Sequence, residues 1–365
     1  MQAKELTLTN FRNYESAHLS FSDGINILYG DNAQGKTNIL EAVYLFSMGK
    51  SNRAHRDGEL ILHGQPSADL SLTFADSIRE SQADIRLFRS RRKQIAVNEI
   101  PVRKNSELVG RFRVVYFGPE YLGLVKEGPK ARRKNMDIVI SQLKPAYFSA
   151  LSELKKIVES KNALLKMEHP NQAMLEIMNE KLIAVSTEII ACRSQYIQKI
   201  GSLAKEIQNE ISMGKEDLSL TYQSSVGTAD NLSREEIADT LRLRLSDAWQ
   251  RELDLRESVI GPHREDIDYT INGKDAKAFA SQGQQKTVVL VQKLAEVHLM
   301  KQETGELPVL LLDDIMSELD KKRQGFILSH IRDMQILITC TDVDGFSLDA
   351  DARLFSIENG QITNC

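Results

Sequence analysis

The sequence has 365 residues, enough for two domains, and 41% hydrophobic and 27% charged residues, as in ordinary globular proteins. Its net charge of −4 excludes a chain that is basic throughout, although a local basic face remains possible. No apolar run approaches the about 20 residues that cross a membrane, and the N-terminus lacks a secretory signal. We therefore expect a cytoplasmic protein. The cysteines Cys192, Cys340 and Cys365 are too scattered to predict a disulfide framework or a zinc site.

The first third of the chain predicts strands around one glycine-bounded loop and one helix. Apolar and polar residues alternate in several segments, which is typical of half-buried strands. The strands are expected at residues 4–9, 18–21, 25–29 and in several segments from 68 to 117. Residues 36–47 have helical periodicity, and Asn98-Glu99 predicts a hairpin turn.

The middle of the chain is predicted to be helical. Residues 146–213 have helical character that is interrupted once, at the His-Pro-Asn sequence of residues 169–171. This predicts a helical hairpin with arms of about 22 and 42 residues. Strand-helix-strand patterning returns after about residue 260. We expect a discontinuous α/β head of residues 1–118 and 258–365 and an inserted, mainly helical lobe of residues 119–257.

Residues 30–37, GDNAQGKT, match the phosphate-loop pattern G-x-x-x-x-G-K-[ST] in full, between a predicted strand and a predicted helix. The glycines let the backbone N–H groups turn toward phosphates, and the helix N-terminus adds its positive dipole end. Lys36 places a charge at the β- and γ-phosphates, and the Thr37 hydroxyl is a magnesium ligand. The predicted nucleotide-binding residues are Gly30, Asp31, Asn32, Ala33, Gln34, Gly35, Lys36 and Thr37.

A second motif is the apolar strand at residues 309–312 that runs into Asp313 and Asp314. In this Walker B arrangement Asp313 holds magnesium, and Asp314 polarises the attacking water as a general base. A buried strand that ends in an acidic loop is common by itself. The motif gains its meaning from the phosphate loop in the same chain.

A third motif, ASQGQ at residues 280–284, precedes a helix predicted from Gln285 to about Lys301. Ser281 and the N–H groups near Gly283 would form a second anion site at a helix N-terminus. Because the phosphate loop already holds one side of a nucleotide, this site makes sense for the γ-phosphate bound by another subunit. The alternative is an ordinary capped helix after a flexible loop.

The order of these motifs resembles that of the ABC-type ATPases, and more narrowly their chromosome-maintenance and break-repair branch. Stretches from the first strand to the last third of the chain are similar to a bacterial DNA repair and recombination member of that branch. They are LTNFRNY (8–14), GDNAQGKTNILEAVYL (30–45), GKSNRAHRDGELI (49–61), FGPEYLGLVKEGPKARRKNMD (117–137), GPHRED (261–266), ASQGQQKTVVL (280–290) and LLLDDIMSELD (310–320).

The resemblance implies an ABC-type head, a mixed sheet with helices, that binds ATP and magnesium and dimerises on ATP. Ser281, Gly283 and Gln284 would complete the site of the opposite subunit, with Ser281 catalytic in trans, and residues 317–320 would line the dimer seam. Arg12 would lie near the nucleotide; the alternative is a solvated arginine. The implied partners are duplex DNA, single-strand/duplex junctions, the recombinase RecA and the mediators RecO and RecR. The implied setting is the SOS response to DNA damage.

Three departures from the wider ABC pattern predict slow hydrolysis. Asp314 stands where a longer glutamate is usual, and Gln282 replaces the first signature glycine. No histidine follows His330, so the usual switch histidine is missing, and Thr339 or Thr341 stands in its region.

Basic residues gather in two segments that could track DNA phosphates. Residues 86–113 hold nine Lys and Arg against two Glu, a local charge of +7. A second cluster comprises Lys130, Arg132, Arg133 and Lys134, and lysines are spaced along the first helical arm. A solvated strand surface is the alternative. No base-reading module is evident, so recognition of backbone and shape is expected.

Two other classes of function remain open. One is a subunit that energises a membrane transporter, against which stand the basic strands and the helical hairpin between Lys36 and Ser281. The other is a clamp in which ATP only gates dimerisation and hydrolysis is incidental.

Overall fold

The computed structural model describes residues 1–331, 333–343 and 352–364, so Cys365 lies outside the described residues. The chain divides into two compact units. Unit 1 comprises Met1–Leu122 with Lys293–Cys365, and unit 2 comprises Gly123–Gln292.

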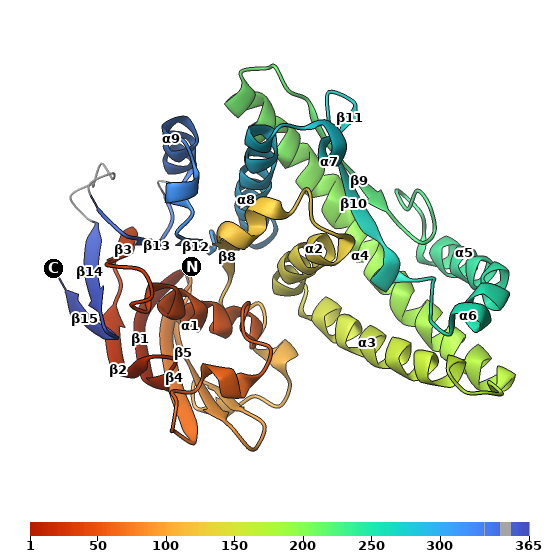
Figure 1. The fold of residues 1–365 in the computed structure, drawn as a ribbon, viewed down its shortest axis with the longest axis horizontal. Coiled ribbons are helices and arrows are strands. Elements are labelled where there is room, and N and C mark those ends of the chain that lie inside the picture. The colour runs from red at the N-terminus through yellow and green to blue at the C-terminus, as the bar shows by residue number, and fades with distance from the viewer. Residues whose placement is uncertain (332, 344–351, 365) are drawn as a thin grey trace. The chain divides into compact units, whose positions relative to one another are not determined.

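The first sheet of unit 1 is antiparallel, with the strand order β2-β1-β4-β5-β6-β7 (Figure 1). Fully buried residues alternate with more accessible ones along β4 and β5, which places one row of apolar side chains on the inner face. Asn98 and Glu99 have φ of 49° and 64° and join β6 to β7, which confirms the predicted hairpin turn. The strands are β1 Gln2–Phe11, β2 Tyr14–Ser20, β4 Ser67–Ala75, β5 Glu80–Phe88, β6 Gln94–Val97 and β7 Ile100–Pro101.

The second sheet of unit 1 has the order β15-β14-β3-β13-β12-β8, and all neighbours are parallel except β15 and β14. Strands β8, β12 and β13 are buried along their whole length, because a parallel sheet is covered on both faces. The strands are β3 Ile25–Tyr29, β8 Val114–Phe117, β12 Val309–Asp313, β13 Ile336–Cys340, β14 Arg353–Glu358 and β15 Gln361–Asn364.

Helix α1 (Lys36–Met48) packs against both sheets of unit 1, on β4 of the first and on β8, β12 and β13 of the second. Nearly all of its residues are buried, as its apolar sequence requires. Helix α9 (Lys321–His330) follows the Walker B strand. The predicted strand-loop-helix context of the phosphate loop is therefore confirmed.

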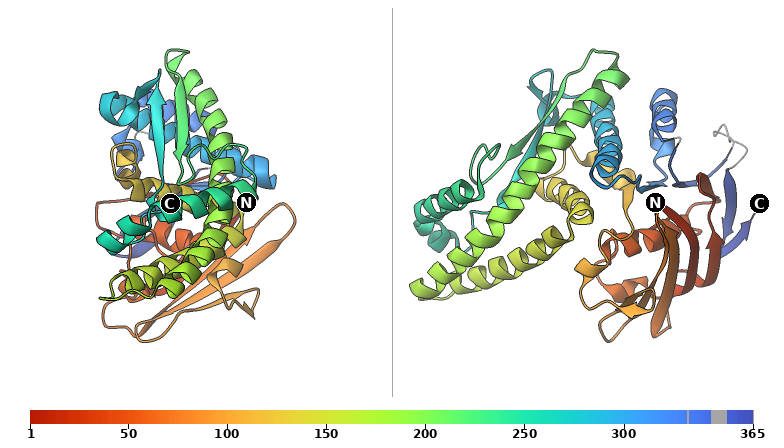
Figure 2. Two further views of the ribbon diagram at one scale, coloured as in Figure 1. Left: turned by 90° about the vertical axis from the view of Figure 1, so that its right-hand side faces the viewer. Right: turned by 180° about the vertical axis from the view of Figure 1, so that it is seen from behind.

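Unit 2 contains the predicted helical hairpin. Helix α3 (Pro145–Leu165) is followed by α4 (Gln172–Ser212), which runs beside it and extends beyond it (Figure 2). The Asn171 side chain accepts a hydrogen bond from the Met174 amide and caps α4 at the predicted break. The other elements are α2 Pro129–Leu143, β9 Leu218–Gln223, α5 Arg234–Asp247, α6 Trp249–Leu255, β10 Asp266–Ile271, β11 Lys274–Asp275 and α7 Ala276–Phe279.

The second unit boundary falls inside α8 (Gln282–Thr304), between Gln292 and Lys293, whereas the sequence suggested a return to the head near residue 258. Residues 258–292 group with unit 2 because β10 pairs with β9 in an antiparallel sheet. No helix among the described residues is long and apolar enough to cross a membrane.

Candidate nucleotide-binding site

The phosphate loop follows the carboxyl end of β3, a central strand of the parallel sheet. Gly30 and Gly35 have φ of 141° and 116°, a region that side chains rarely adopt. A Cβ on Gly30 would lie 2.4 Å from the Ile357 carbonyl oxygen, and one on Gly35 would lie 2.6 Å from Asn13 Nδ2. Both positions therefore require glycine for conformation and for space.

Lys36 lies at the start of α1 and is only 5% exposed. Its Nζ donates to the carbonyl oxygens of Gly30 and Asp31, the second at 2.9 Å. The ammonium group thus lies within the curve of the loop, where the pattern places the charge that meets phosphates.

Asp313, at the end of β12, is the centre of a cluster of hydroxyl groups. Its Oδ1 accepts hydrogen bonds from Thr37 Oγ1 and Thr339 Oγ1, each at 2.8 Å, and its Oδ2 accepts one from Tyr116 OH at 2.8 Å. The donors come from α1, β13 and β8, which the parallel sheet brings to one edge. A carboxylate beside a threonine hydroxyl is the hard oxygen donor set that magnesium prefers, so these residues fit the ion.

Asp314 follows in a left-handed conformation, with φ of 53°. Its backbone N–H donates to Thr339 Oγ1 at 2.9 Å. Partial burial raises the pKa of the Asp314 carboxyl, the carboxylates of Asp313 and Glu318 raise it further, and Lys36 opposes them. A raised pKa makes this carboxylate a better proton acceptor.

Sequence reasoning missed Tyr116 and Glu120. Tyr116 packs edge-on against Tyr44 and Tyr121, with ring centroids 5.8 and 6.0 Å apart, and so its hydroxyl is held at Asp313. Glu120 has an exposed side chain, and partial desolvation, followed by the charge of Asp313, raises the pKa of its carboxyl. The sequence around them, Phe-Gly-Pro-Glu after an apolar strand, matches no motif that would predict these contacts.

Arg12, expected near the nucleotide, pairs with Glu41 in the structure. Its Nε and Nη2 each lie 2.8 Å from a Glu41 carboxylate oxygen, and its Nη1 donates to the Glu59 carbonyl oxygen at 3.0 Å. Glu41 is a buried residue of α1, and Ser51 Oγ also donates to it. Arg12 therefore links the turn between β1 and β2 to the helix of the phosphate loop.

The signature residues lie in unit 2 and form a reciprocal cap. The Ser281 N–H donates to Gln284 Oε1 at 2.9 Å, and the Gln284 N–H donates to Ser281 Oγ at 3.2 Å. This is a capping box at the start of α8. Gln284 Nε2 also donates to Glu216 Oε1 at 2.9 Å. The capped-helix interpretation thus describes the local structure, and an anion site at the same N-terminus remains a prediction.

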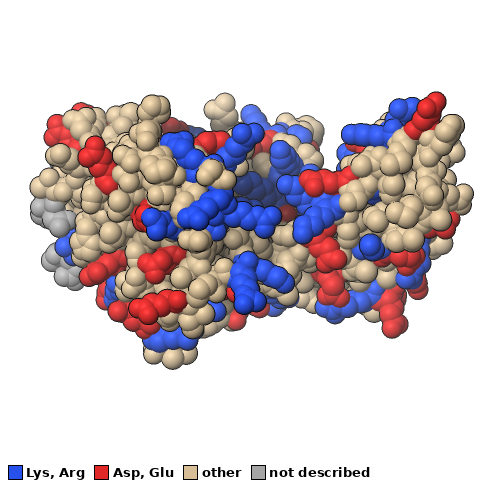
Figure 3. Space-filling view, turned by 90° about the horizontal axis from the view of Figure 1, so that it is seen from below, with Lys and Arg blue, Asp and Glu red and all other residues tan. Residues whose placement is uncertain are grey.

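The first basic cluster is partly occupied by internal contacts. Arg89 donates to the carbonyl oxygens of Gly58, Ile61, Leu62 and Gln65 at 2.7 to 3.3 Å, and thereby holds that loop. Lys93 and Arg86 pair with Asp57 and Asp69 at 3.1 and 3.0 Å. Arg91 and Arg92 are exposed. Figure 3 shows one face of the protein with its Lys and Arg side chains in blue.

The second basic cluster is partly structural. Arg132 is 3% exposed and pairs with Asp266 at 2.7 Å, and Arg133 Nη1 donates to the Glu265 carbonyl oxygen. Lys161 of the first helical arm is also buried and pairs with Glu252 at 2.6 Å. These three side chains are less suited to DNA than their charge suggested.

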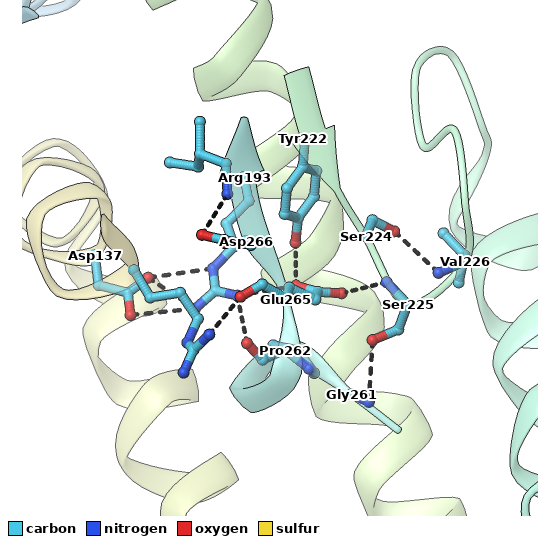
Figure 4. A network of polar contacts seen from close by, with 12 residues as sticks. Asp137, Arg193, Tyr222, Ser224, Ser225, Val226, Gly261, Pro262, Glu265 and Asp266 are labelled. Atoms are coloured by element: carbon cyan, nitrogen blue, oxygen red, sulfur yellow. Dashed lines mark hydrogen bonds and ion pairs between the residues drawn. The ribbon is translucent and has the colours of Figure 1, made fainter. Parts of the chain in front are cut away.

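The GPHRED segment, residues 261–266, forms part of a buried network in unit 2 (Figure 4). Arg193 of α4 pairs with Asp137 and Glu265 at 3.0 and 2.9 Å and donates to the Pro262 carbonyl oxygen at 2.7 Å. Tyr222 OH donates to Glu265, and the Ser225 N–H donates to it at 2.9 Å. The segment therefore joins α2, α4 and β9, which gives it a structural role that the sequence did not reveal.

Comparisons with known proteins agree on one family. The family model of the RecF/RecN/SMC N-terminal domain matches residues 2–362. The chain is similar to the DNA replication and repair protein RecF of Clostridium perfringens, with 39% identity over 99% of both chains. Its counterpart from Clostridium acetobutylicum is 40% identical over 99% of both.

Solved structures agree with this. A structure of the recombination mediator protein RecF-ATP in the RecFOR pathway matches with a TM-score of 0.92 and 35% identity, covering 100% of this chain and 97% of that chain. The Smc head domain of Pyrococcus furiosus matches with a TM-score of 0.56 and 17% identity over 100% of this chain and 96% of that one, which shows the fold alone. The predicted ABC-type head with an added helical part is thereby confirmed.

Proposed function

The chain belongs to the RecF family of the RecF/RecN/SMC proteins, and from that premise we propose an ATP-gated DNA-binding protein of recombinational repair and replication restart. ATP would drive dimerisation, and the dimer would bind duplex or gapped DNA and help load a recombinase. The family membership removes the reason to consider a transporter subunit.

The observation that carries the proposal is the cluster around Asp313 beside the phosphate loop. Residues 30–37 would hold the phosphates of ATP, while Thr37 and Asp313 would hold magnesium, which supplies positive charge to the phosphates when bound. The 2.8 Å contact between Thr37 Oγ1 and Asp313 Oδ1 supports this assignment, because both oxygens must face one ion. Arg12 would also lie near the nucleotide.

Asp314 would act as the general base that accepts a proton from the attacking water. Its raised pKa supports the role, and its short side chain supports slow turnover. Ser281, Gly283 and Gln284 would complete the site of the opposite subunit. A dimer in which ATP only gates assembly is the second candidate, and the short reach of Asp314 favours it.

The DNA and protein partners rest on the relatives. The solved relative is described as a recombination mediator of the RecFOR pathway. We therefore propose RecO, RecR and RecA as partners, and single-strand/duplex junctions as DNA targets. Exposed Arg91 and Arg92 provide charge for phosphate contacts.

The experiment that tests the function compares DNA binding with and without ATP on linear and gapped duplexes at fixed salt. We expect tighter binding with ATP and magnesium and no such gain for Lys36→Met, because loss of its ammonium group removes the charge that meets the phosphates. Equal binding with and without ATP would contradict an ATP-gated protein. Measuring turnover in the same samples separates a working ATPase from a clamp with incidental hydrolysis.

A further inference from the structure

The turn that follows α4 brings a carboxylate to the signature residues, within unit 2. Helix α4 ends at Ser212, and Met213 and Gly214 turn the chain with φ of 54° and 76°. Glu216 follows this turn, and its Oε1 accepts a hydrogen bond from Gln284 Nε2 at 2.9 Å. The contact joins the C-terminal end of α4 to the start of α8 (Figure 1).

The position of Glu216 is fixed by contacts on both sides of it in the sequence. Its backbone N–H donates to Ser212 Oγ at 3.1 Å, and its Oε2 accepts from Gln208 Nε2 at 2.5 Å. The Asn272 side chain donates to the carbonyl oxygen of the residue before Glu216 at 3.1 Å and accepts from the N–H of the residue after it at 2.7 Å. The backbone and one carboxylate oxygen of Glu216 are therefore held, and the other oxygen contacts Gln284.

This contact determines which way the Gln284 amide points. An ionised carboxylate accepts hydrogen bonds and cannot donate them, whereas an amide side chain does both. Glu216 therefore holds the NH₂ group of Gln284, which leaves Oε1 to accept the Ser281 N–H at 2.9 Å. If the amide were reversed, its NH₂ group would face the Ser281 N–H, two donors without an acceptor, and the reciprocal cap would be lost.

The cap in turn determines which group of Ser281 can meet an anion. The Ser281 N–H is used by the Gln284 side chain, and Ser281 Oγ accepts the Gln284 N–H through a lone pair. The O–H hydrogen of Ser281 can still be donated. Ser281 is exposed, so this hydrogen is accessible from outside the chain. The placement of the hydroxyl thus depends on Gln284, and the orientation of Gln284 depends on Glu216.

We propose that Glu216 is a positioning residue of the signature. By orienting the Gln284 amide, it holds the Ser281 hydroxyl where it donates to the γ-phosphate bound by the partner subunit. The inference rests on the proposed function, because it assumes that the signature completes the opposite site. Glu216 itself would touch no phosphate. Through Gln208 it also connects α4, the long arm of the helical hairpin, to the signature.

Glu216→Met tests this role, because methionine is similar in size but is only a weak acceptor. ATP binding by the monomer should equal that of the wild type, since residues 30–37 lie in unit 1. ATP turnover should fall by about tenfold, the lower end of the loss caused by removing a residue that orients a functional group. Glu216→Asp should regain most of the turnover, because its carboxylate also accepts without donating. The matched control, Glu206→Met, removes the same charge at an exposed position of α4 and should turn over ATP like the wild type.

Mixing experiments show whether Glu216 acts on the site of the opposite subunit. Lys36→Met cannot bind ATP but retains its signature, so in a mixed dimer it would supply that signature to the intact phosphate loop of Glu216→Met. The turnover of this mixture should exceed the sum of the two variants measured apart. Glu216→Met mixed with Ser281→Arg should show no such gain, because both substitutions affect the signature half of the site. Ser281→Arg mixed with Lys36→Met is the reference for a shared site.

The outcomes distinguish a failure of this inference from a failure of the shared site. If the reference mixture gains turnover but Glu216→Met with Lys36→Met does not, Glu216 acts within its own chain and the proposal is refuted. Wild-type turnover of Glu216→Met, an equal loss in Glu206→Met, or weaker ATP binding by the Glu216→Met monomer would refute it as well. If the reference mixture gains nothing, there is no shared site, and the proposed function fails together with this role. Circular dichroism melts check that each variant remains folded.

Discussion

At the scale of single residues, the carboxylate of Asp313 is held by hydroxyl groups from three elements. Thr37 and Thr339 donate to one oxygen and Tyr116 donates to the other. Three O–H donors from different elements fix the orientation of a carboxylate. Thr339 also accepts the Asp314 N–H, so one hydroxyl contacts the carboxylate of Asp313 and the backbone of Asp314.

The roles of the two aspartates can be separated by isosteric substitutions. Asp314→Asn should retain ATP and magnesium but lower turnover by about 10²- to 10⁴-fold, because the amide cannot accept the proton. An ATP-bound dimer should then accumulate and sediment faster. Asp313→Asn should instead raise the magnesium concentration needed for ATP binding. If Asp313→Asn traps the dimer while Asp314→Asn has wild-type turnover, the two roles are reversed.

His263 should make the stability of unit 2 depend on pH. Burial lowers its pKa to about 4, below the about 6.5 of a free histidine. Between these values the unfolded chain binds a proton that the folded chain does not. The free energy of unfolding should therefore fall as pH drops from about 6.5 toward 4, by up to about 3 kcal/mol.

The measurement is urea unfolding followed by Trp249 fluorescence, which reports on the same unit, at pH 7.5 and at pH 5. His263→Asn should lose part of the pH dependence, while His169→Asn, at an exposed position, should retain it. Identical pH dependence in wild type and His263→Asn would show that His263 does not control it.

At the scale of elements, the sequence predicted those helices, strands and loops whose formation depends on neighbouring residues. The strand, loop and helix at residues 25–48 and the hairpin of α3 and α4 followed from periodicity, glycine spacing and one proline. The pairing of β10 with β9 is non-local, so no local pattern indicated that residues 258–292 group with unit 2.

Contacts between side chains far apart in the sequence could not be predicted from it either. Arg132 and Asp266 are separated by 134 positions, and Tyr116 and Asp313 by 197. A count of charges cannot distinguish an arginine that is free to meet a phosphate from one that holds a loop. The strands, loop and helix that carry the nucleotide motifs were therefore predictable from the sequence, whereas the contacts around Asp313 and the internal use of the basic clusters were not.

Substitutions in the first basic cluster should distinguish arginines that bind DNA from arginines that stabilise the fold. Arg91→Gln with Arg92→Gln should weaken DNA binding and reduce the log–log salt slope by up to about 0.9 for each phosphate that is no longer neutralised. The free energy of unfolding should stay within about 0.5 kcal/mol of wild type. Arg89→Gln should instead cost about 1 kcal/mol, because it removes the donors that hold residues 58–65.

Arg79→Gln, an exposed change of equal charge on the turn between β4 and β5, is the control for both measurements. If the salt dependence of DNA binding is unchanged in the Arg91 and Arg92 variant, the DNA-binding surface lies elsewhere in the protein.

At the scale of the whole molecule, the phosphate loop belongs to unit 1 and the signature to unit 2. Ser281 lies 244 positions beyond Thr37 in the sequence. The proposed dimer would pair the phosphate loop of one chain with the signature residues of the other. A substitution in the phosphate loop and one in the signature would then affect different halves of a shared site.

Mixing two defective variants tests this arrangement. Ser281→Arg should bind ATP as a monomer but fail to dimerise or hydrolyse it, and Lys36→Met should fail to bind ATP. A mixed dimer would contain one composite site with an intact loop and an intact signature, so ATPase activity should partly return on mixing. If Ser281→Arg loses ATP binding as an isolated monomer, the signature acts within its own chain and the shared site is excluded.

The strand order of the parallel sheet also has a consequence for biosynthesis. Within the described residues, both neighbours of β3, namely β13 and β14, and the only neighbour of β8, β12, come from beyond residue 308. At 5–20 residues per second, roughly 10 to 45 s pass between synthesis of β8 and of β13.

Unit 2 is contiguous in the sequence and can fold during this interval. We expect ribosome-stalled chains ending near residue 330, from which all of unit 2 has emerged, to resist protease within Gly123–Gln292 but to be cut at β3 and β8. Equal protection of all three segments would show that β3 and β8 pair with other strands before β12 and β13 are available. The segment proposed to hold the phosphates is thus translated early and gains its sheet last, so the nascent chain exposes unpaired strands that chaperones recognise.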